Sequence, residues 1–107
     1  MRNSIPGIGR IEKEVAVFRV WLDHTIFPFP FMRIKIYRIR RGEYQASPNV
    51  LRKDRETGEP NYICGIGNSV ETAMSDFFKY YLDDIRQNSV NGQLSEDDFD
   101  WSAPEDF

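Results

Sequence analysis

The sequence has very little of the residues that most metal centres and nucleophilic active sites require. It contains one cysteine, Cys64, and one histidine, His24, in 107 residues. A zinc site of the usual ligand types would therefore need carboxylates as well, and a Cys–His nucleophile would need these two residues to meet in space. We expect no metal, no cofactor and no catalysis, and we keep a small enzyme that uses His24 or Cys64 as an alternative.

Long apolar runs and targeting segments are also missing. No segment approaches the ~20 apolar residues that cross a bilayer. The N-terminus, MRNSIPGIGR, lacks the apolar stretch of a secretory signal. The single cysteine excludes an internal disulfide, which agrees with a reducing compartment. These absences predict a cytoplasmic protein with no membrane partner.

The sequence does contain enough apolar surface for one folded domain. Hydrophobic residues make up 40% and aromatic residues 14% of the chain. This composition is too apolar for a disordered protein and, at this length, sufficient for one modest core. We expect a single domain over 1–107, with a mobile N-terminal arm at 1–10, a folded body at 11–95 and an acidic tail at 96–107.

Charge is distributed unevenly along the chain. The tail carries six acidic residues and no basic one, so residues 1–95 have a net charge of +3 although the whole chain has −3. Residues 33–55 contain eight basic residues and two acidic ones, a net charge of +6. A separation of this size bears on partners and solubility rather than on fold.

A first strand is expected at residues 15–22, VAVFRVWL. Its valine and aromatic content is typical of a strand buried on at least one face, which would bury Trp21. The FPFPF that follows cannot lie inside a strand or a helix, because each proline lacks an N–H donor and forces its predecessor toward extended geometry. We expect an extended connection or a sheet edge there.

A hairpin is expected at residues 32–48. The segment MRIKIYRIRR alternates with the period of two that is typical of a strand with one buried and one exposed face. The buried set is Met32, Ile34 and Ile36, and the exposed set is Arg33, Lys35 and Tyr37. The alternation breaks at Ile39, where we expect a bulge, and Gly42 supplies the turn.

A third strand is expected at YICGIG, after a long polar excursion at residues 48–61. We expect Cys64 to be a small core residue within this strand. Gly65 and Gly67 would let the strand turn sharply into the helix that follows.

The helix is expected over residues 69–88. Asn68 is the candidate N-cap, and Glu71 three residues later completes a capping box. Apolar residues at spacings of three and four predict one buried stripe, formed by Val70, Ala73, Met74, Phe77, Tyr81 and Ile85. The sequence thus predicts an α+β domain in which an antiparallel sheet of three to four strands carries one main helix on one face.

Over residues 42–85 the order of these signals resembles the HicB-like antitoxin domain: a hairpin with GEYQASPN, a strand YICGIG, and a helix NSVETAMSDFFKYYLDDI. The glycine, hydroxyl residue and Glu-Ala pair that open the family's helix are approximated by Gly67, Ser69, Glu71 and Ala73, with Thr72 splitting the pair. The chain departs from the family in its charged excursion, in an extra first strand and in lacking a DNA-binding segment. The resemblance implies a helix-covered antiparallel sheet and a protein-binding habit.

The exposed side of the basic hairpin is the candidate partner-binding surface. Bases around an aromatic residue suit an acidic protein partner or a nucleic-acid backbone, and they also suit a merely solvated sheet face. The candidate residues are Arg33, Lys35, Tyr37, Arg38, Arg40 and Arg41. We favour a small, non-catalytic protein-binding module whose partner the sequence does not specify, with a nucleic-acid-binding protein as the alternative.

The acidic tail is the second candidate interaction segment. Its acids lie beside aromatic residues, so we expect it either to fold over the basic hairpin by charge attraction or to stay free for a basic partner. The candidate residues are Asp97, Asp98, Asp100 and Trp101. The tail lacks the ordered spacing and central glycine of a calcium loop, and we expect no metal there.

Overall fold

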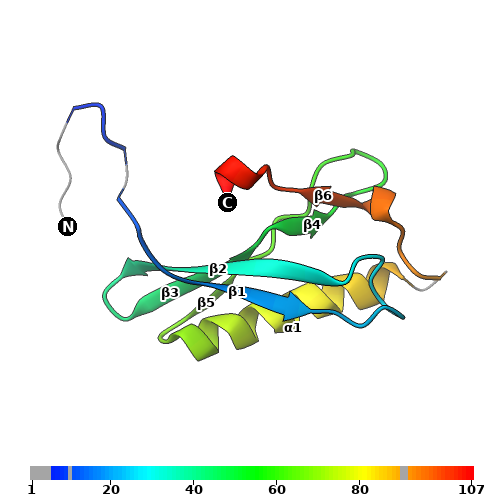
Figure 1. Ribbon diagram of the computed structural model, residues 1–107, viewed down its shortest axis with the longest axis horizontal. Coiled ribbons are helices and arrows are strands. Elements are labelled where there is room, and N and C mark those ends of the chain that lie inside the picture. Colours follow the sequence, from blue (N-terminus) through cyan, green and yellow to red (C-terminus); the bar gives the residue numbers. More distant parts are fainter. Residues whose placement is uncertain (1–5, 10, 90–91) are drawn as a thin grey trace.

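The main sheet and a long helix form two layers in the computed structural model, which describes residues 6–9, 11–89 and 92–107 (Figure 1). The sheet is antiparallel, with the strand order β1-β2-β3-β5. Its elements are β1 (Lys13–Trp21), β2 (Phe31–Arg40), β3 (Glu43–Pro48), β5 (Gly65–Gly67) and the helix α1 (Val70–Asn88). The predicted α+β fold is confirmed. The predicted mobile arm at 1–10 falls largely outside the described residues.

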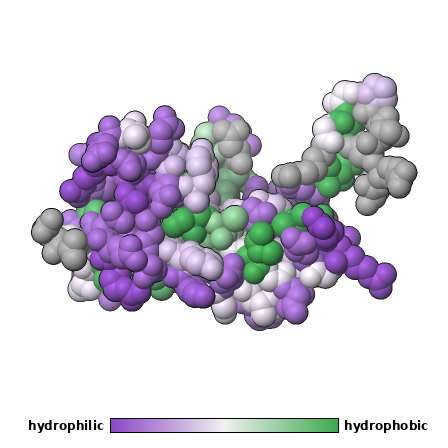
Figure 2. All heavy atoms as spheres, turned by 180° about the vertical axis from the view of Figure 1, so that it is seen from behind, coloured by the Kyte–Doolittle hydropathy of each residue, from purple (hydrophilic) through white to green (hydrophobic). Residues whose placement is uncertain are grey.

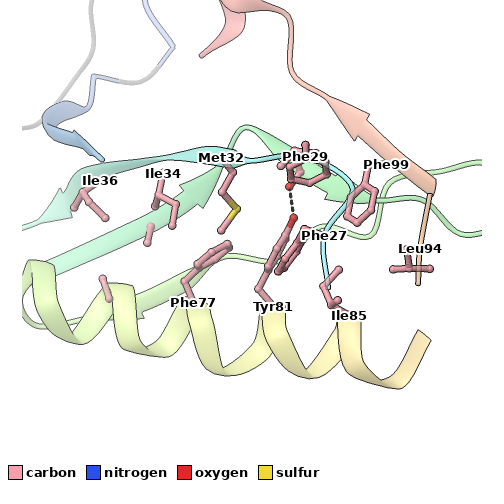
Figure 3. Packing of buried hydrophobic residues seen from close by; sticks show 13 residues of the cluster. Phe27, Phe29, Met32, Ile34, Ile36, Phe77, Tyr81, Ile85, Leu94 and Phe99 are labelled. Atoms are coloured by element: carbon pink, nitrogen blue, oxygen red, sulfur yellow. Dashed lines mark hydrogen bonds between the residues drawn. The ribbon is translucent and has the colours of Figure 1, made fainter. Parts of the chain in front are cut away.

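The core lies between α1 and one face of the sheet. Met32, Ile34 and Ile36 of β2 have no exposed surface, as their alternation predicts, and they point toward α1 (Figure 3). The predicted helix stripe is also confirmed: Ala73, Phe77, Tyr81 and Ile85 are buried, and Val70 and Met74 pack against them half-buried. Phe77 and Tyr81 stack with their ring centroids 4.9 Å apart.

The FPFPF segment inserts two aromatic rings into this core. Phe27 and Phe29 are buried, and Phe27 stacks parallel to Tyr81 at 6.4 Å between centroids. The loop closes where the Leu22 N–H donates to the Pro30 carbonyl at 2.8 Å. The prolines therefore connect β1 to β2 without breaking a ladder, as expected from their missing donors.

The expected burial of the first strand is wrong. β1 is the edge of the sheet, and seven of its nine residues are exposed. Trp21, which we expected to be buried, is 68% exposed. The reason is lateral position: α1 packs mainly on β3 and β5 and leaves the far edge uncovered. The expected bulge near Ile39 is confirmed by a register shift between Arg38 and Arg40 in the β2–β3 pair.

The helix and its N-cap each begin one residue later than predicted. Ser69, not Asn68, is the N-cap: its hydroxyl accepts from the Thr72 N–H at 3.1 Å, and the Thr72 hydroxyl accepts from the Ser69 N–H at 2.9 Å. Thr72 thus takes the role that the sequence pattern assigned to Glu71. Two orphan amide groups are satisfied at the helix start in either arrangement.

Gly65 and Gly67 are required by close packing rather than by a sharp turn. A Cβ on Gly65 would collide with the backbone of Ala73 and Phe77, and one on Gly67 would collide with the backbone next to Thr72. The helix therefore lies directly against β5. The neighbouring Cys64 is exposed, so its expected core position is wrong. It precedes β5 instead of lying inside a strand.

A second, two-stranded sheet was not predicted. β4 (Val50–Arg52), within the polar excursion, pairs antiparallel with β6 (Phe99–Trp101), within the acidic tail. The short 3-10 helices η1 (Glu96–Asp98) and η2 (Pro104–Asp106) flank β6. Phe99 is 4% exposed. The first half of the tail is thus part of the folded body.

Asn49 joins the two sheets. Its side-chain oxygen accepts from the Arg33 N–H at 2.9 Å, and its own N–H donates to the Arg33 carbonyl at 2.9 Å. Its carbonyl accepts from the Ser102 N–H at 2.9 Å. Asn49 therefore extends the hydrogen-bond ladder of β2 and fixes the position of the chain just after β6.

Polar contacts from α1 hold β4 in place. The Arg52 guanidinium donates to both carboxylate oxygens of Asp84, at 2.9 and 3.0 Å, and Asn61 donates to the same carboxylate at 2.9 Å. Hydrogen bonding to Asp84 raises the pKa of Arg52. The Tyr81 hydroxyl donates to the Val50 carbonyl at 2.9 Å, drawn as a dashed line in Figure 3, and burial raises the pKa of this hydroxyl.

Candidate partner-binding site

The face of the main sheet that points away from α1, called the outer face below, presents polar and aromatic side chains. Strand alternation directs Arg33, Lys35 and Tyr37 of β2 to this face, opposite Gln45 and Ser47 of β3. The Tyr37 hydroxyl lies 3.2 Å from the Ser47 hydroxyl, within hydrogen-bond distance. These groups are fixed by the sheet rather than by loops.

Two grooves lie on the outer face. The first has a volume of about 470 Å³; Lys35, Tyr37, Gln45 and Ser47 line it together with Glu14 and Tyr62. The second, of about 510 Å³, is lined by Phe31, Arg33, Asn49, Trp101 and Pro104. Ser102 and Phe107 border both grooves, so the C-terminal segment stands between them. Figure 1 shows this segment on the opposite side of the sheet from α1.

Lys35 is the charged group most closely held on this face. Its ammonium lies 3.3 Å from a carboxylate oxygen of Glu14 and 4.7 Å from the ring centroid of Phe107. Only 14% of the Lys35 side chain is exposed, against 66% for Glu14. A cation on the face of an aromatic ring is attracted by the ring quadrupole. The outer face thus holds an aromatic residue of the chain's own C-terminal segment.

A second cation lies on aromatic rings near the edge strand. The guanidinium carbon of Arg19 is 4.8 Å from the ring centroid of Phe31 and 5.8 Å from that of Trp21. The two rings meet edge to face with their centroids 5.3 Å apart. Aromatic rings and cations alternate across this end of the outer face. Such a surface suits both apolar and charged segments of a partner.

The structure divides the six candidate partner-binding residues into two groups. Arg33, Lys35 and Tyr37 share the outer face and line its grooves. The other three lie at the hairpin end: Arg38 is opposite Tyr44 on the other face, Arg40 pairs with Glu43 at 3.0 Å, and Arg41 is exposed in the turn.

The candidate residues of the acidic tail contact groups other than the basic residues of the hairpin. Asp98 pairs with Arg55, with a nitrogen–oxygen distance of 3.0 Å, and hydrogen bonds from Arg55 hold the pKa of Asp98 below its usual 3.8. Trp101 packs edge to face on Phe29 at 4.8 Å between ring centroids. Asp97 and Asp100 are exposed. The contact with the basic strand comes instead from the ring of Phe107.

His24 and Cys64, the two residues of the alternative enzyme hypothesis, do not share a groove. His24 is exposed in the loop between β1 and β2, and its carbonyl accepts from the Gln93 side chain at 2.9 Å. Cys64 lines the first groove, which does not include His24. In the parts of the chain that the structure describes, no three His, Cys, Asp or Glu side chains are grouped to hold a metal ion.

Sequence reasoning missed the residues that give the grooves their walls. Tyr62 and Phe107 lie far from the basic run in sequence, and nothing local marks them as neighbours of Lys35. Phe31 precedes Arg33 by two residues in β2, so alternation places both on the same face. The position of Phe107 follows from the pairing of β6 with β4, two strands that are distant in sequence. The one signal available was the repeated occurrence of aromatic residues in the acidic tail.

In the space-filling view from behind, hydrophilic residues cover most of the surface, and hydrophobic residues show in the middle of the body (Figure 2). No helix among the described residues is long and apolar enough to cross a membrane. Comparison with family models, with curated proteins and with solved structures gives no match for this chain.

Proposed function

We propose that this chain is a small, non-catalytic protein-binding module of the cytoplasm, antitoxin-like or regulatory, which takes a segment of a partner protein on its outer face. One observation carries the proposal: α1 covers one face of the sheet except at its β1 edge, whereas in the part of the chain that the structure describes the short C-terminal segment is what lies on the other face. That segment leaves two grooves beside it, of about 470 and 510 Å³.

The chemistry of the grooves favours a protein over a nucleic acid. The first groove combines Lys35 with Glu12 and Glu14 and adds the amide of Gln45. Carboxylates within the groove would repel the phosphates that dominate nucleic-acid binding. A peptide segment, which carries both charges and apolar side chains, meets complementary groups there.

The element order supports the antitoxin-like form of the proposal. β2, β3, β5 and α1 follow one another as hairpin, third strand and helix, the order on which the resemblance to the HicB-like domain was based. A gene for a small basic protein next to this one would supply the partner to test. The proposal places that partner on the outer face and not on α1.

The test measures binding of the purified product of the adjacent gene by calorimetry. Replacing Arg33→Glu and Tyr37→Ala together should weaken the complex more than tenfold, equivalent to about 1.4 kcal/mol. Lys79→Ala on the exposed side of α1 is the matched control and should leave the affinity unchanged. Binding that survives the double change, or that Lys79→Ala abolishes, would place the interface elsewhere.

Nucleic-acid binding is tested in parallel with a separate variant at the hairpin end. Salt-dependent retention of the wild-type chain on nucleic acid, lost when Arg38, Arg40 and Arg41 at the hairpin end are replaced by alanine, would favour the alternative function. Retention unaffected by these changes would count against a hairpin site.

A further inference from the structure

The outer edge of β1 has the geometry of a strand that lacks a partner. No described strand pairs with β1 on the side away from β2. The Leu22 N–H donates to the Pro30 carbonyl, and the register of β1 with β2 continues this pairing without a shift back to Ala16. Because hydrogen-bonded pairs alternate in an antiparallel ladder, the N–H and C=O groups of Val17, Arg19 and Trp21 point to the free edge.

This edge has few of the features that keep sheet edges apart. The strand contains no proline, its charged residues are Lys13, Glu14 and Arg19, and its bulge lies at the start, between Glu14 and Ala16. Large apolar side chains are exposed along it: Val15 at 42%, Val17 at 51%, Phe18 at 39% and Trp21 at 68%. The opposite edge strand, β5, has three residues. The long apolar edge is therefore the one built for pairing.

We propose that β1 pairs antiparallel with β1 of a second copy of this chain, with the two-fold axis at Val17. Val17 is the middle of the nine residues Lys13–Trp21, so this register sets the whole strand against its copy, with the bulge at Val15 opposite Arg19. Each Val17 N–H then donates to the Val17 carbonyl of the other copy. Two four-stranded sheets join into one continuous sheet through a closed, two-fold interface.

The side chains of β1 are self-complementary in this register. On the α1 side of the sheet, the small Ala16 lies opposite Phe18 of the second copy, and Phe18 lies opposite its Ala16. On the outer face, Arg19 lies opposite Val15, beside Glu14 of the second copy. Direct cross-strand neighbours are close enough for such size and charge matching to stabilise the pair.

Neighbouring registers are less favourable. An axis at Arg19 would set two guanidinium groups directly opposite each other, and an axis at Ala16 would set Arg19 opposite Lys13. Like charges in direct cross-strand positions are destabilising. An axis at Phe18 shortens the paired segment by two residues. The charges and the length of β1 thus favour the register in which the two-fold axis lies at Val17.

The first test is the mass of the wild-type chain by sedimentation across a range of protein concentrations. The chain is expected to shift from 12.6 kDa toward twice that mass as concentration rises. Val17→Lys sets two ammonium groups opposite each other at the axis and should hold the chain at the monomer mass. Val17→Thr keeps strand propensity and should dimerise. Circular dichroism checks that both variants fold, which their exposed position favours.

The second test fixes the register. In a Cys64→Ser background, Val17→Cys should form a disulfide-linked dimer under mild oxidation, because paired residues at the axis lie about 5.5 Å apart at Cα, within disulfide range. Leu82→Cys, an exposed apolar position on α1, should not. A wild-type chain that stays monomeric at all concentrations, a dimer that Val17→Lys leaves intact, or equal cross-linking at residues 17 and 82 would each overturn the proposal.

Discussion

The two faces of β2 differ in what covers them. On one face Met32, Ile34 and Ile36 are fully buried beneath a helix of 19 residues. On the other, Arg33, Lys35 and Tyr37 lie beneath a short C-terminal segment and beside two grooves. Residues that alternate along one strand therefore lie in different surroundings: the first set stabilises the fold, and the second set forms the surface on which we propose that a partner binds.

The largest expected effect on the free energy of unfolding comes from a substitution in the core between α1 and β2. Phe77→Ala should lower the free energy of unfolding by ~3 to 5 kcal/mol, because the apolar ring is lost and a cavity remains. Tyr37→Phe on the outer face of the sheet removes one hydrogen bond, to Ser47, and should change it by about 1 kcal/mol or less. Urea unfolding measures both. A cost below about 1 kcal/mol for Phe77→Ala would show that this face is not the core.

A smaller effect is expected where α1 holds β4. Asp84→Ala removes the carboxylate that accepts from Arg52 and Asn61, and it should cost about 1 to 3 kcal/mol, because the guanidinium loses its charged partner. The neighbouring Asp83→Ala is the control, since its pair with Arg86 is exposed and such pairs contribute less than about 1 kcal/mol. Equal costs in urea unfolding would contradict a specific role for Asp84.

The ion pair of Asp98 should give a still smaller, pH-dependent effect. Arg55 lowers the pKa of Asp98 in the folded chain, so this carboxylate stabilises the fold above about pH 4, and the contribution is lost as the pH falls through the lowered pKa. Asp98→Asn should cost less than about 1 kcal/mol at neutral pH. At the acid end of the range the variant and the wild type should converge. A difference that grows on acidification would reverse the sign and refute the assignment; Asp97→Asn is the exposed control.

Salt should have no effect on the environment of Trp101. Its ring packs on Phe29, so contact between apolar rings rather than charge holds it. Trp21 is 68% exposed and must be removed by Trp21→Phe before fluorescence is read. The emission maximum should then be the same at physiological salt and near 1 M, where the screening length is ~3 Å. A red shift at high salt would instead show that charge attraction holds the tail, as its sequence suggests.

Most of the main sheet and α1 could be predicted from the sequence, because their signals are local and periodic. The alternation around Ile34 and the stripe around Phe77 each extend over enough residues to define a buried face. β4 and β6 have three residues each and no usable period. Their existence depends on pairing between Val50 and Trp101, which no local pattern reveals.

The candidate site could be predicted only in part for the same reason. Alternation placed Arg33, Lys35 and Tyr37 together on one face, but the grooves need walls from Phe107 and Tyr62. The exposure of Trp21 and Cys64 was missed because composition indicates strand formation without indicating which strand lies at an edge.

Removal of residues 102–107 tests the contrast between the two faces most directly. The truncated chain should retain its helix and sheet by circular dichroism and lose about 1 kcal/mol or less in urea unfolding, because the described contacts of this segment with the sheets are the Phe107 ring on Lys35 and the hydrogen bond from Ser102 to Asn49. Phe77→Ala, measured beside it, should lose several times more. A truncated chain as unstable as Phe77→Ala would contradict the account, because the outer face would then be part of the core.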